Sequence, residues 1–388
     1  MNDKQTANLS IQKANRTGIY TLFRRERELT RQDIVRELHL SLPTVIQNIS
    51  ELQQEGLVQE DGFVGHTGGR KARTYSMVKN ARTAIGLDIT RNRIAVVLVD
   101  LSGKVISEKN EQCKFERTES YFRRIGQHIE EVVKKYGEDG EMILGAGIGL
   151  PCLITPDNQT VTFGEFLKCT GAACGEFAEF IRYPAALYND ASAAGFAEFW
   201  IRRKQENPVR FGKNGFPDIS TFYLMLSSNI GGSIMINNRI HQGIHYRSGG
   251  IGHLTLHPKG KPCYCGQRGC VDAYLATSIL ASHANDSLPE FFRLLESGNK
   301  TVSNAWNTYL DDLALTVNNL AALFDCTIIL GGYLGKFLDR HIDELKERAA
   351  RLNFIEKNGD YLETGLYKTN SIAAGAALNL IAGFIDSI

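Results

Sequence analysis

The chain contains no uninterrupted apolar run long enough to cross a bilayer, which takes about 20 residues. Its first residues, MNDKQTANLSIQKANR, are polar and lack the apolar core of a secretory signal peptide. From both absences we expect a cytoplasmic protein. Proline is scarce, with 9 residues among 388, whereas hydrophobic residues make up 43% and charged residues 22%. This composition is typical of a soluble globular protein and argues against a disordered chain, a collagen or a coiled coil.

Cysteine is also sparse, and eight residues in a chain of this length are too few for a disulfide scaffold. A local cluster of cysteines is therefore expected to bind a metal ion. The net charge is only +1, although residues 1–80 carry 12 Lys and Arg against 9 Asp and Glu. That small excess permits a nucleic-acid role for the N-terminal part without deciding it. The length predicts two or three domains.

The first eighty residues show the pattern of three short helices. An amphipathic helix is predicted over residues 11–27, with a buried stripe formed by Ile11, Ala14, Ile19, Leu22 and Phe23. Thr30 stands at the N-cap of a second helix, with Asp33 as its partner in a capping box. The second helix is expected to bury Ile34, Val35 and Leu38. After the turn HLS, a third helix begins at the N-cap Ser41 and ends at Gly56.

Three short helices, the last two joined by a tight turn, predict a helix-turn-helix whose third helix enters the major groove of DNA. The polar side chains expected on its exposed face, suited to base edges or phosphates, are Ser41, Thr44, Gln47 and Asn48. The apolar side chains expected in the core are Val45, Ile49 and Leu52. A small helical docking module for another protein is the alternative interpretation.

A basic, glycine-rich loop follows the three helices. Strands are predicted over residues 57–63 and 74–78, and the loop between them, GHTGGRKART, carries Arg70, Lys71 and Arg73. A basic loop alone is usually solvated surface. Directly behind a helix-turn-helix it is instead expected to be a wing whose tip contacts DNA phosphates or the minor groove. This position favours the DNA-binding interpretation over the docking module.

The rest of the chain alternates strand and helix patterns. Strands or hairpins are predicted over residues 84–106, 140–155, 221–240 and 326–332, helical patterning covers 117–136, and a strand runs into a helix over 183–200. Asn189 and Asp190 stand at that last junction. Mixed strands and helices with glycine-rich junctions predict an α/β core of two lobes.

Several of these segments resemble the ROK family, named for repressors, open reading frames and kinases. The most specific segment is GGIGHLTLHPKGKPCYCGQRGCVDAY, and the others are GLDITRNRIAVVLVDLSGKVI, YNDASAAG, IILGG and AAGAAL. The resemblance implies the two-lobed α/β actin-like ATPase fold of sugar kinases, preceded by the winged helix-turn-helix of the branch that includes the xylose and N-acetylglucosamine repressors. We expect a DNA-binding domain over 1–78, a first lobe over 79–198 joined by a C-terminal helix over 371–388, and a second lobe with a zinc loop over 199–370.

Four candidate metal ligands lie close together in the most specific segment. His253, Cys263, Cys265 and Cys270 give the pattern H-x9-C-x-C-x4-C. Zinc favours four nitrogen or sulfur ligands in a tetrahedron, and a glycine-rich loop lets closely spaced thiolates converge. The alternatives are unmetallated thiols or His257 as the nitrogen donor, but His253 matches the family's zinc position. A zinc with all four positions filled is expected to be structural, and the other five cysteines are expected to be scattered core or surface thiols.

The resemblance also implies a sugar site. Asn189 and Asp190 match the family's pair that binds a sugar hydroxyl, and Asp190 matches the catalytic base of the kinases. His253 matches a residue that faces both the sugar and the zinc, and Asp272 stands where the family usually has Glu. Gly250 replaces the glutamate of the family's GEIGH motif, so one sugar-binding carboxylate is missing. Because an Asn-Asp pair before a helix is also a common cap, a purely structural role is the alternative for this pair.

The two loops that hold ATP phosphates in the family's kinases are altered here. The D-x-G-G-T turn reads DITRN at residues 88–92, and the G-T-G-x-G loop reads SSNIGG at residues 227–232. Lost glycines leave less room for a phosphate against the backbone. Phosphoryl transfer depends chiefly on positioning and neutralising the phosphates, so we expect no kinase activity. Because the positive charge of Arg91 can attract an anion, weak nucleotide binding stays an alternative.

Together these patterns favour a sugar-responsive transcription factor, expected to be a repressor that binds operator double-stranded DNA as a homodimer or tetramer. One alternative is an active sugar kinase fused to a DNA-binding domain. The other is a regulator controlled by a protein partner, such as a sugar-transport protein. The sequence names neither the sugar nor the operator nor the regulated genes.

Overall fold

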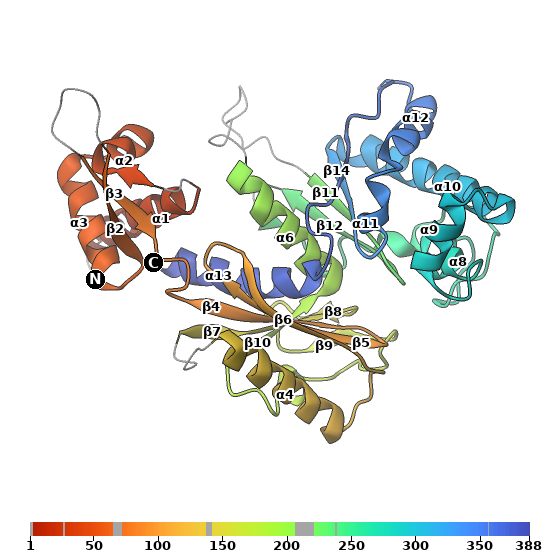
Figure 1. Cartoon of the computed structure of the whole chain (residues 1–388), viewed down its shortest axis with the longest axis horizontal. Coiled ribbons are helices and arrows are strands. Elements are labelled where there is room, and N and C mark those ends of the chain that lie inside the picture. Colours follow the sequence, from red (N-terminus) through yellow and green to blue (C-terminus); the bar gives the residue numbers. More distant parts are fainter. Residues whose placement is uncertain are drawn as a thin grey trace.

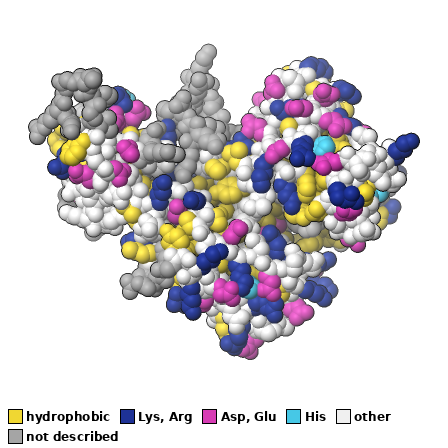
Figure 2. All heavy atoms as spheres, viewed as in Figure 1, with side chains coloured by type: hydrophobic (Ala, Val, Ile, Leu, Met, Phe, Trp, Pro, Cys, Tyr) yellow, Lys and Arg dark blue, Asp and Glu magenta, His cyan; other side chains and the backbone are white. Residues whose placement is uncertain are grey.

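The computed structural model of the chain describes residues 3–25, 28–64, 72–136, 142–205, 221–236, 239–355 and 357–388. Its elements form a small N-terminal domain and two lobes, each lobe built on its own five-stranded sheet (Figure 1). On the face drawn in Figure 2, basic and acidic side chains are interspersed over both lobes, as the near-zero net charge predicts. Within the described ranges, no helix is both long and apolar enough to span a membrane.

The N-terminal domain is a winged helix-turn-helix, as predicted. Its helices are α1 (Asp3–Arg25), α2 (Arg31–Leu38) and α3 (Leu42–Gln54), and its strands are β1 (Leu29–Thr30), β2 (Val58–Val64) and β3 (Ala72–Met77). Thr30 caps α2 through the predicted capping box with Asp33, and the Ser41 side chain caps α3 by accepting from the Thr44 backbone N–H at 3.3 Å. In the antiparallel sheet, β3 lies between β1 and β2.

The prediction for the first helix is wrong in its start and in two of the five residues of its buried stripe. α1 begins at Asp3, and Ile11 and Ala14 are exposed, Ile11 by 57%. The predicted residues from Ile19 onward are buried. The reason lies in the helix lengths, because α1 has 23 residues and α3 only 13, so the early turns of α1 extend past the helix on which it packs.

The first lobe carries a mixed sheet with the strand order β10-β7-β4-β5-β6. Its strands are β4 (Thr83–Ile89), β5 (Arg93–Asp100), β6 (Val105–Gln112), β7 (Ile143–Leu150) and β10 (Ala185–Asn189), with β8 (Leu153–Ile154), β9 (Val161–Phe163) and α5 (Cys174–Phe177) inserted before β10. One face is covered by α4 (Glu119–Tyr136) and the other by α13 (Ser371–Ser387) (Figure 1). The helix α6 (Asp190–Gln205) packs on α13 and also against strands of the second lobe.

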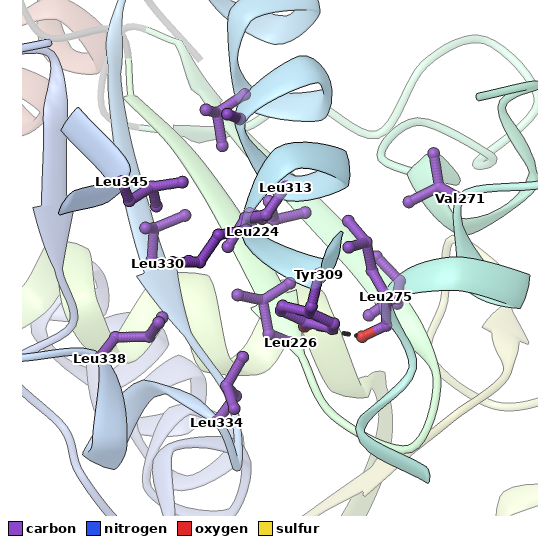
Figure 3. Packing of buried hydrophobic residues seen from close by; sticks show 14 of the residues in the cluster. Leu224, Leu226, Val271, Leu275, Tyr309, Leu313, Leu330, Leu334, Leu338 and Leu345 are labelled. Carbon is purple, nitrogen blue, oxygen red and sulfur yellow. Dashed lines mark hydrogen bonds between the residues drawn. The ribbon is translucent and has the colours of Figure 1, made fainter. Parts of the chain in front are cut away.

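The second lobe carries a sheet with the order β13-β12-β11-β14-β15. Its strands are β11 (Thr221–Leu226), β12 (Ile230–Ile236), β13 (Arg239–Ile240), β14 (Thr327–Gly331) and β15 (Leu362–Thr364). Its helices are η1 (Ile251–His253), α7 (Asp272–Leu275), α8 (Thr277–Ala281), α9 (Leu288–Glu296), α10 (Lys300–Phe324), α11 (Gly335–Leu338) and α12 (Ile342–Leu352). Figure 3 shows leucines of β11 and β14 packed against α10, where the Tyr309 hydroxyl donates to the Leu275 carbonyl at 2.8 Å.

Two glycines let α13 approach the first sheet closely. A Cβ added to Gly86 on β4 would lie 1.8 Å from the Ala373 carbonyl oxygen, and one added to Gly147 on β7 would lie 2.3 Å from that of Ala376. Any larger residue at these positions would push the helix off the sheet. α13 is thereby held in place across the sheet, and its C-terminal end lies beside the winged-helix domain (Figure 1).

The winged-helix domain shares one hydrophobic core with the first lobe. A single cluster of buried side chains runs from Ile19 and Phe23 on α1, through Trp200 on α6, to Ile381 and Ile385 on α13. The expected boundary between residues 198 and 199 falls within α6, which contacts strands of both sheets. α6 therefore contacts the winged-helix domain and both lobes.

Candidate functional site

The exposed face of α3 presents some of the residues that the sequence predicted for DNA contact. Ser41 and Gln47 are exposed and Thr44 is half-buried. The Ser41 and Thr44 hydroxyls share a hydrogen bond of 2.8 Å, and the Gln47 amide donates to the Glu51 carboxylate at 3.1 Å. As expected, Val45, Ile49 and Leu52 are fully buried.

Asn48 is a correction to the predicted face. Only 3% of Asn48 is exposed, and its amide nitrogen donates to the Thr44 carbonyl one turn earlier at 2.8 Å. The residue belongs to the buried side of α3, because it follows Val45 by three positions and precedes Leu52 by four. It therefore supports the helix and offers no group to DNA.

The wing is only partly within the described residues. Arg70 and Lys71 lie outside them. Arg73 stands at the start of β3 with an exposed side chain, 3.0 Å from the Glu60 carboxylate and 5.8 Å from the centre of the Phe63 ring. An exposed ion pair of this kind contributes at most about 1 kcal/mol, so a DNA phosphate can compete for Arg73.

The four predicted metal ligands converge. The ligand atoms of His253, Cys263, Cys265 and Cys270 all lie within 4.8 Å of one another. The Cys265 and Cys270 sulfurs are 3.7 Å apart, close to the spacing of roughly 3.8 Å for two sulfurs at about 2.3 Å from one tetrahedral zinc. These residues fit a metal ion. His257 lies outside the cluster, because its Nε2 is 2.6 Å from the Asp312 carboxylate.

The loop conformation requires its glycine at residue 269. Gly269 has a φ of +82°, and an added Cβ would lie 1.8 Å from the His257 carbonyl oxygen. The backbone N–H of Gly269 donates to the Lys261 carbonyl at 2.8 Å, which closes the loop on itself. Cys263 and Cys270 are thereby brought to opposite sides of one small site.

A large cavity lies between the lobes beside this loop. Its volume is about 990 Å³, and its lining includes Asn189, Asp190, Gly250 and His253. Three of the four predicted sugar-site residues therefore face one space. A Cβ added to Gly250 would meet nothing closer than the Arg247 carbonyl oxygen at 3.5 Å, so the position of the missing family glutamate is open.

Asp190 begins α6 and is 5% exposed. One carboxylate oxygen accepts the Ala191 backbone N–H at 2.7 Å and the other lies 3.4 Å from the Asn229 amide. Burial raises the pKa of Asp190 to about 7, and the nearby charge of Asp88 acts in the same direction. Such a carboxyl group changes its ionisation near neutral pH.

Asn189 fulfils the structural alternative as well as lining the cavity. Its side-chain oxygen accepts the Ser192 backbone N–H at 2.9 Å, which is a helix cap for α6. Its amide nitrogen donates to the Cys152 carbonyl and to the Asp190 carboxylate, each at 3.1 Å. Asn189 therefore orients Asp190 and fixes the start of α6.

Asp272 is a second correction, because it is absent from the cavity lining. It is 5% exposed, and its carboxylate accepts the Ile230 backbone N–H at 2.7 Å. Burial raises its pKa, while the Ile230 hydrogen bond and the His253 charge oppose the rise. Through this hydrogen bond, the Asp272 carboxylate fixes the start of β12.

The first altered phosphate loop is closed by its own side chains. Asp88 is 1% exposed and forms an ion pair with Arg93. The Arg91 guanidinium lies 4.6 Å from the centre of the Phe166 ring and donates to the Phe166 carbonyl at 3.3 Å. In the second loop, the Ser227 hydroxyl accepts the Tyr333 backbone N–H at 3.0 Å. Both arginines that follow the Asp88 position therefore already have partners within the protein.

The cavity extends to the winged-helix domain, which the sequence did not indicate. Thr17, Thr21 and Arg24 of α1 contribute to its lining together with Trp200 of α6. The Arg24 guanidinium carbon lies 3.8 Å from the centre of the Trp200 ring. The same cavity is thus bounded at one end by the candidate sugar residues and at the other by the DNA-binding domain.

Comparison with known proteins agrees with this architecture. The xylose repressor of Caldicellulosiruptor bescii is 24% identical over 381 residues, covering 92% of this chain and 93% of that protein. The DNA-binding transcriptional dual regulator NagC of Escherichia coli K12 is 23% identical over 291 residues, covering 73% of this chain and 67% of that protein.

Two solved structures show the same fold. A ROK family transcriptional regulator, a homologue of the E. coli MLC protein, superposes with a TM-score of 0.75 at 18% identity, covering 97% of this chain and 98% of that chain. A ROK family glucokinase from Streptomyces griseus, bound to glucose and AMPPNP, gives 0.61 at 20% identity and covers 76% of this chain and 98% of that one. A winged helix-turn-helix DNA-binding model matches residues 13–59, and the ROK family model matches residues 84–378. The chain belongs to the ROK family.

Proposed function

We propose that this protein is a carbohydrate-responsive transcriptional repressor, which binds operator DNA through α3 and the wing and changes its DNA affinity when a small carbohydrate enters the cavity. The observation that carries the proposal is the cavity itself, lined by Asp190 and His253 at one end and by Thr21 and Arg24 of the DNA-binding domain at the other. A ligand there occupies a space that both functional parts of the chain line. The naming of the C. bescii relative as a xylose repressor and of the E. coli relative as a DNA-binding transcriptional regulator supports the same conclusion.

DNA binding is assigned to the exposed residues of α3 and to the wing. Ser41, Thr44 and Gln47 are the candidates for base and phosphate contacts. Arg73 is assigned to contacts with DNA phosphates, together with Arg70 and Lys71, which the sequence predicts. Each phosphate that is neutralised adds about one to the slope of log affinity against log salt concentration. Two-fold symmetric operators are read by dimers, so we expect a homodimer or a tetramer on DNA.

Carbohydrate binding is assigned to Asn189, Asp190 and His253. Neutral sugars are held by convergent hydrogen bonds, and an ionised carboxylate is a strong acceptor for hydroxyl groups. Asp190 is pre-positioned for this by the Ala191 N–H and the Asn189 amide. Without a side chain at Gly250, we expect weaker binding than in a pocket with a carboxylate there, or a preference for a different substituent.

Phosphoryl transfer is not part of the proposed function. Asp190 could serve as a general base, but that role supplies only about 10²–10⁴-fold. The larger share comes from holding and neutralising phosphates. Here the Asp88 carboxylate is buried against Arg93, and Arg91 is held by Phe166, so the side chains of the first loop are engaged with the protein itself.

The bound metal is proposed to be a structural zinc held by His253, Cys263, Cys265 and Cys270. One nitrogen and three sulfur donors suit zinc, and four protein ligands leave no position for substrate. The metal would tie His253 of η1 to the glycine-rich loop that carries the three cysteines. Since His253 also lines the cavity, the metal loop sets the position of one wall of the sugar site.

The first experiment selects operator DNA from a library of random 30-base-pair duplexes with the full-length protein. Thermal-shift measurements with D-xylose, D-glucose, N-acetyl-D-glucosamine and cellobiose then identify which sugar stabilises the protein. A coupled assay of ATP consumption with the same panel tests for kinase activity. Stabilisation by at least one sugar without ATP turnover supports the proposal. ATP turnover on the order of 1 s⁻¹, which is within the range of kinases, would contradict the proposal if it is lost in Asp190→Ala. The protein would then be a sugar kinase.

A further inference from the structure

Two of the cysteines that looked scattered in the sequence form a buried pair. The Cys152 and Cys169 sulfurs lie 3.5 Å apart, although seventeen positions separate the residues in the chain. Cys152 lies between β7 and β8, and Cys169 lies in the segment between β9 and α5. Both are free thiols and both are buried.

The surrounding backbone holds the two sulfurs against each other. A Cβ added to Gly164 would lie 2.8 Å from the Cys169 sulfur and 3.1 Å from the Cys152 sulfur, so the pair fills the space beside this glycine. The Cys169 backbone N–H donates to the Gly164 carbonyl at 3.0 Å. Neither thiol can move far from the other without opening this turn.

The pair is also connected to the cavity. Cys152 contributes to the cavity lining, and its carbonyl accepts the Asn189 amide at 3.1 Å. Small solutes that enter the cavity therefore reach the Cys152 side of the pair. Glu165 and Phe166, from the same turn as Cys169, line the cavity as well.

We propose that Cys152 and Cys169 are an oxidisable dithiol, which hydrogen peroxide entering through the cavity converts to an intramolecular disulfide. This inference goes beyond the proposed function, and the disulfide does not depend on whether a sugar binds. It concerns a modification site in the wall of the cavity.

The reaction balances with peroxide as the oxidant. One sulfur of the pair, as the thiolate, attacks one peroxide oxygen, the O–O bond breaks, and the departing hydroxide takes up the proton that the thiol released, giving a sulfenic acid and water. The other sulfur then attacks the sulfenic sulfur, the S–O bond breaks, and hydroxide leaves with the proton of the second thiol as a second water. Two thiols and one peroxide give one disulfide and two waters.

The electrostatics of the pair favour a thiolate. The hydrogen bond between the sulfurs lowers the pKa of Cys169 and raises that of Cys152, and the Arg117 guanidinium adds to the lowering. Because the thiolate is the reactive form, a pair that shares one negative charge is more easily oxidised than two isolated buried thiols.

The test uses the full-length, zinc-loaded protein treated with hydrogen peroxide, alkylated with N-ethylmaleimide and digested with trypsin without reduction. Cleavage after Lys135, Lys168 and Arg182 places Cys152 in the peptide 136–168 and Cys169 in the peptide 169–182. We expect the two peptides to be joined, with a mass two hydrogens below their sum. Dithiothreitol should separate them.

Cys174 provides the matched control, because it is a buried thiol in the same tryptic peptide as Cys169. The joined peptide should persist in Cys174→Ser and disappear in Cys152→Ser and in Cys169→Ser. Alanine variants at 152 and 169, checked by circular dichroism, replace any serine variant that does not fold. Overoxidised but unlinked Cys152, or a linkage that persists without Cys169, would overturn the inference.

Discussion

Arg24 of the winged-helix domain lies over Trp200 of α6, with its guanidinium carbon 3.8 Å from the centre of the indole ring. The two residues are 7% and 4% exposed, so the contact is buried between the bodies it joins. α6 begins at Asp190, the residue assigned to the sugar. One helix therefore carries the proposed sugar contact at its start and a contact to the DNA-binding domain in its second half.

We expect Arg24→Ala to weaken the coupling between sugar and DNA. A desolvated cation–π contact contributes about 0.5–2 kcal/mol, and coupling free energies of about 1–3 kcal/mol are typical. The ratio of DNA dissociation constants with and without sugar should therefore fall severalfold toward one. Arg123→Ala is the control, because Arg123 of α4 lies 4.4 Å from the centre of the Phe180 ring and makes its cation–π contact on the face of the first sheet opposite α13. If the ratio is unchanged in Arg24→Ala, the contact between Arg24 and Trp200 does not transmit the effect of the sugar to the DNA-binding domain.

Neighbouring polar residues on α3 should behave differently when replaced by alanine. Asn48→Ala removes a buried hydrogen bond to Thr44, so it should lower the free energy of unfolding by about 1 kcal/mol and leave the preference among DNA sites unchanged. Gln47→Ala should do the reverse, because Gln47 is exposed. Urea unfolding and competition binding on the selected duplexes measure the two effects. A changed site preference in Asn48→Ala would show that the orientation assigned to α3 is wrong.

Removal of the metal should destabilise the second lobe. Cys265→Ser leaves three ligands for an ion that prefers four, so the variant should lose its zinc and melt at a lower temperature. Cys113→Ser, at a half-buried position outside the cluster, should keep both properties. Elemental analysis and calorimetry report the outcome. Freshly purified wild-type protein without about one zinc per chain would contradict the assignment.

Sugar affinity should rise with pH through neutrality. Burial raises the pKa of Asp190 to about 7, so the carboxyl is protonated below that pH and ionised above it. Since the ionised form is the stronger acceptor for sugar hydroxyls, titration calorimetry should show tighter binding at pH 8 than at pH 6, by up to about tenfold per pH unit below the pKa. Asp190→Asn should show no such dependence. Affinity that falls as pH rises would mean that the protonated acid holds the sugar.

The same pKa has a consequence for stability. An acid whose pKa is higher in the folded state than in the unfolded state loses stability as pH rises between the two values, here from the ordinary 3.8 to about 7. Asp190 therefore costs stability at neutral pH. A costly buried carboxylate in a cavity fits a binding group better than a structural one.

Local features of the sequence predicted much of the fold. Thr30 and Ser41 are capping residues at the predicted helix starts, and the cysteine spacing together with the family resemblance predicted the four residues that converge in the metal cluster. The prediction that Asn48 is exposed is wrong because it rests on the polar side chain. The position of Asn48 in the helix is on the same face as the buried residues Val45 and Leu52. Helical periodicity would have put it inside.

Contacts between distant segments could not be predicted in the same way. Arg24 and Trp200 meet only because α1 packs on α6 and α13, and nothing near either residue indicates the other. Cys152 and Cys169 meet through the turn at Gly164. The Asp272 carboxylate binds the Ile230 backbone N–H, a contact across 42 positions of the chain that is set by the tertiary structure.

The most direct test of the account is the dissociation constant of the selected duplex with and without the sugar found by thermal shift, for wild type and for Asp190→Asn. The account predicts a change of about 5–150-fold in the wild type, the range of typical coupling free energies, and no change in Asp190→Asn, whose DNA affinity without sugar should equal that of the wild type. Wild-type DNA affinity that no sugar in the panel alters, or a full sugar response in Asp190→Asn, would contradict it.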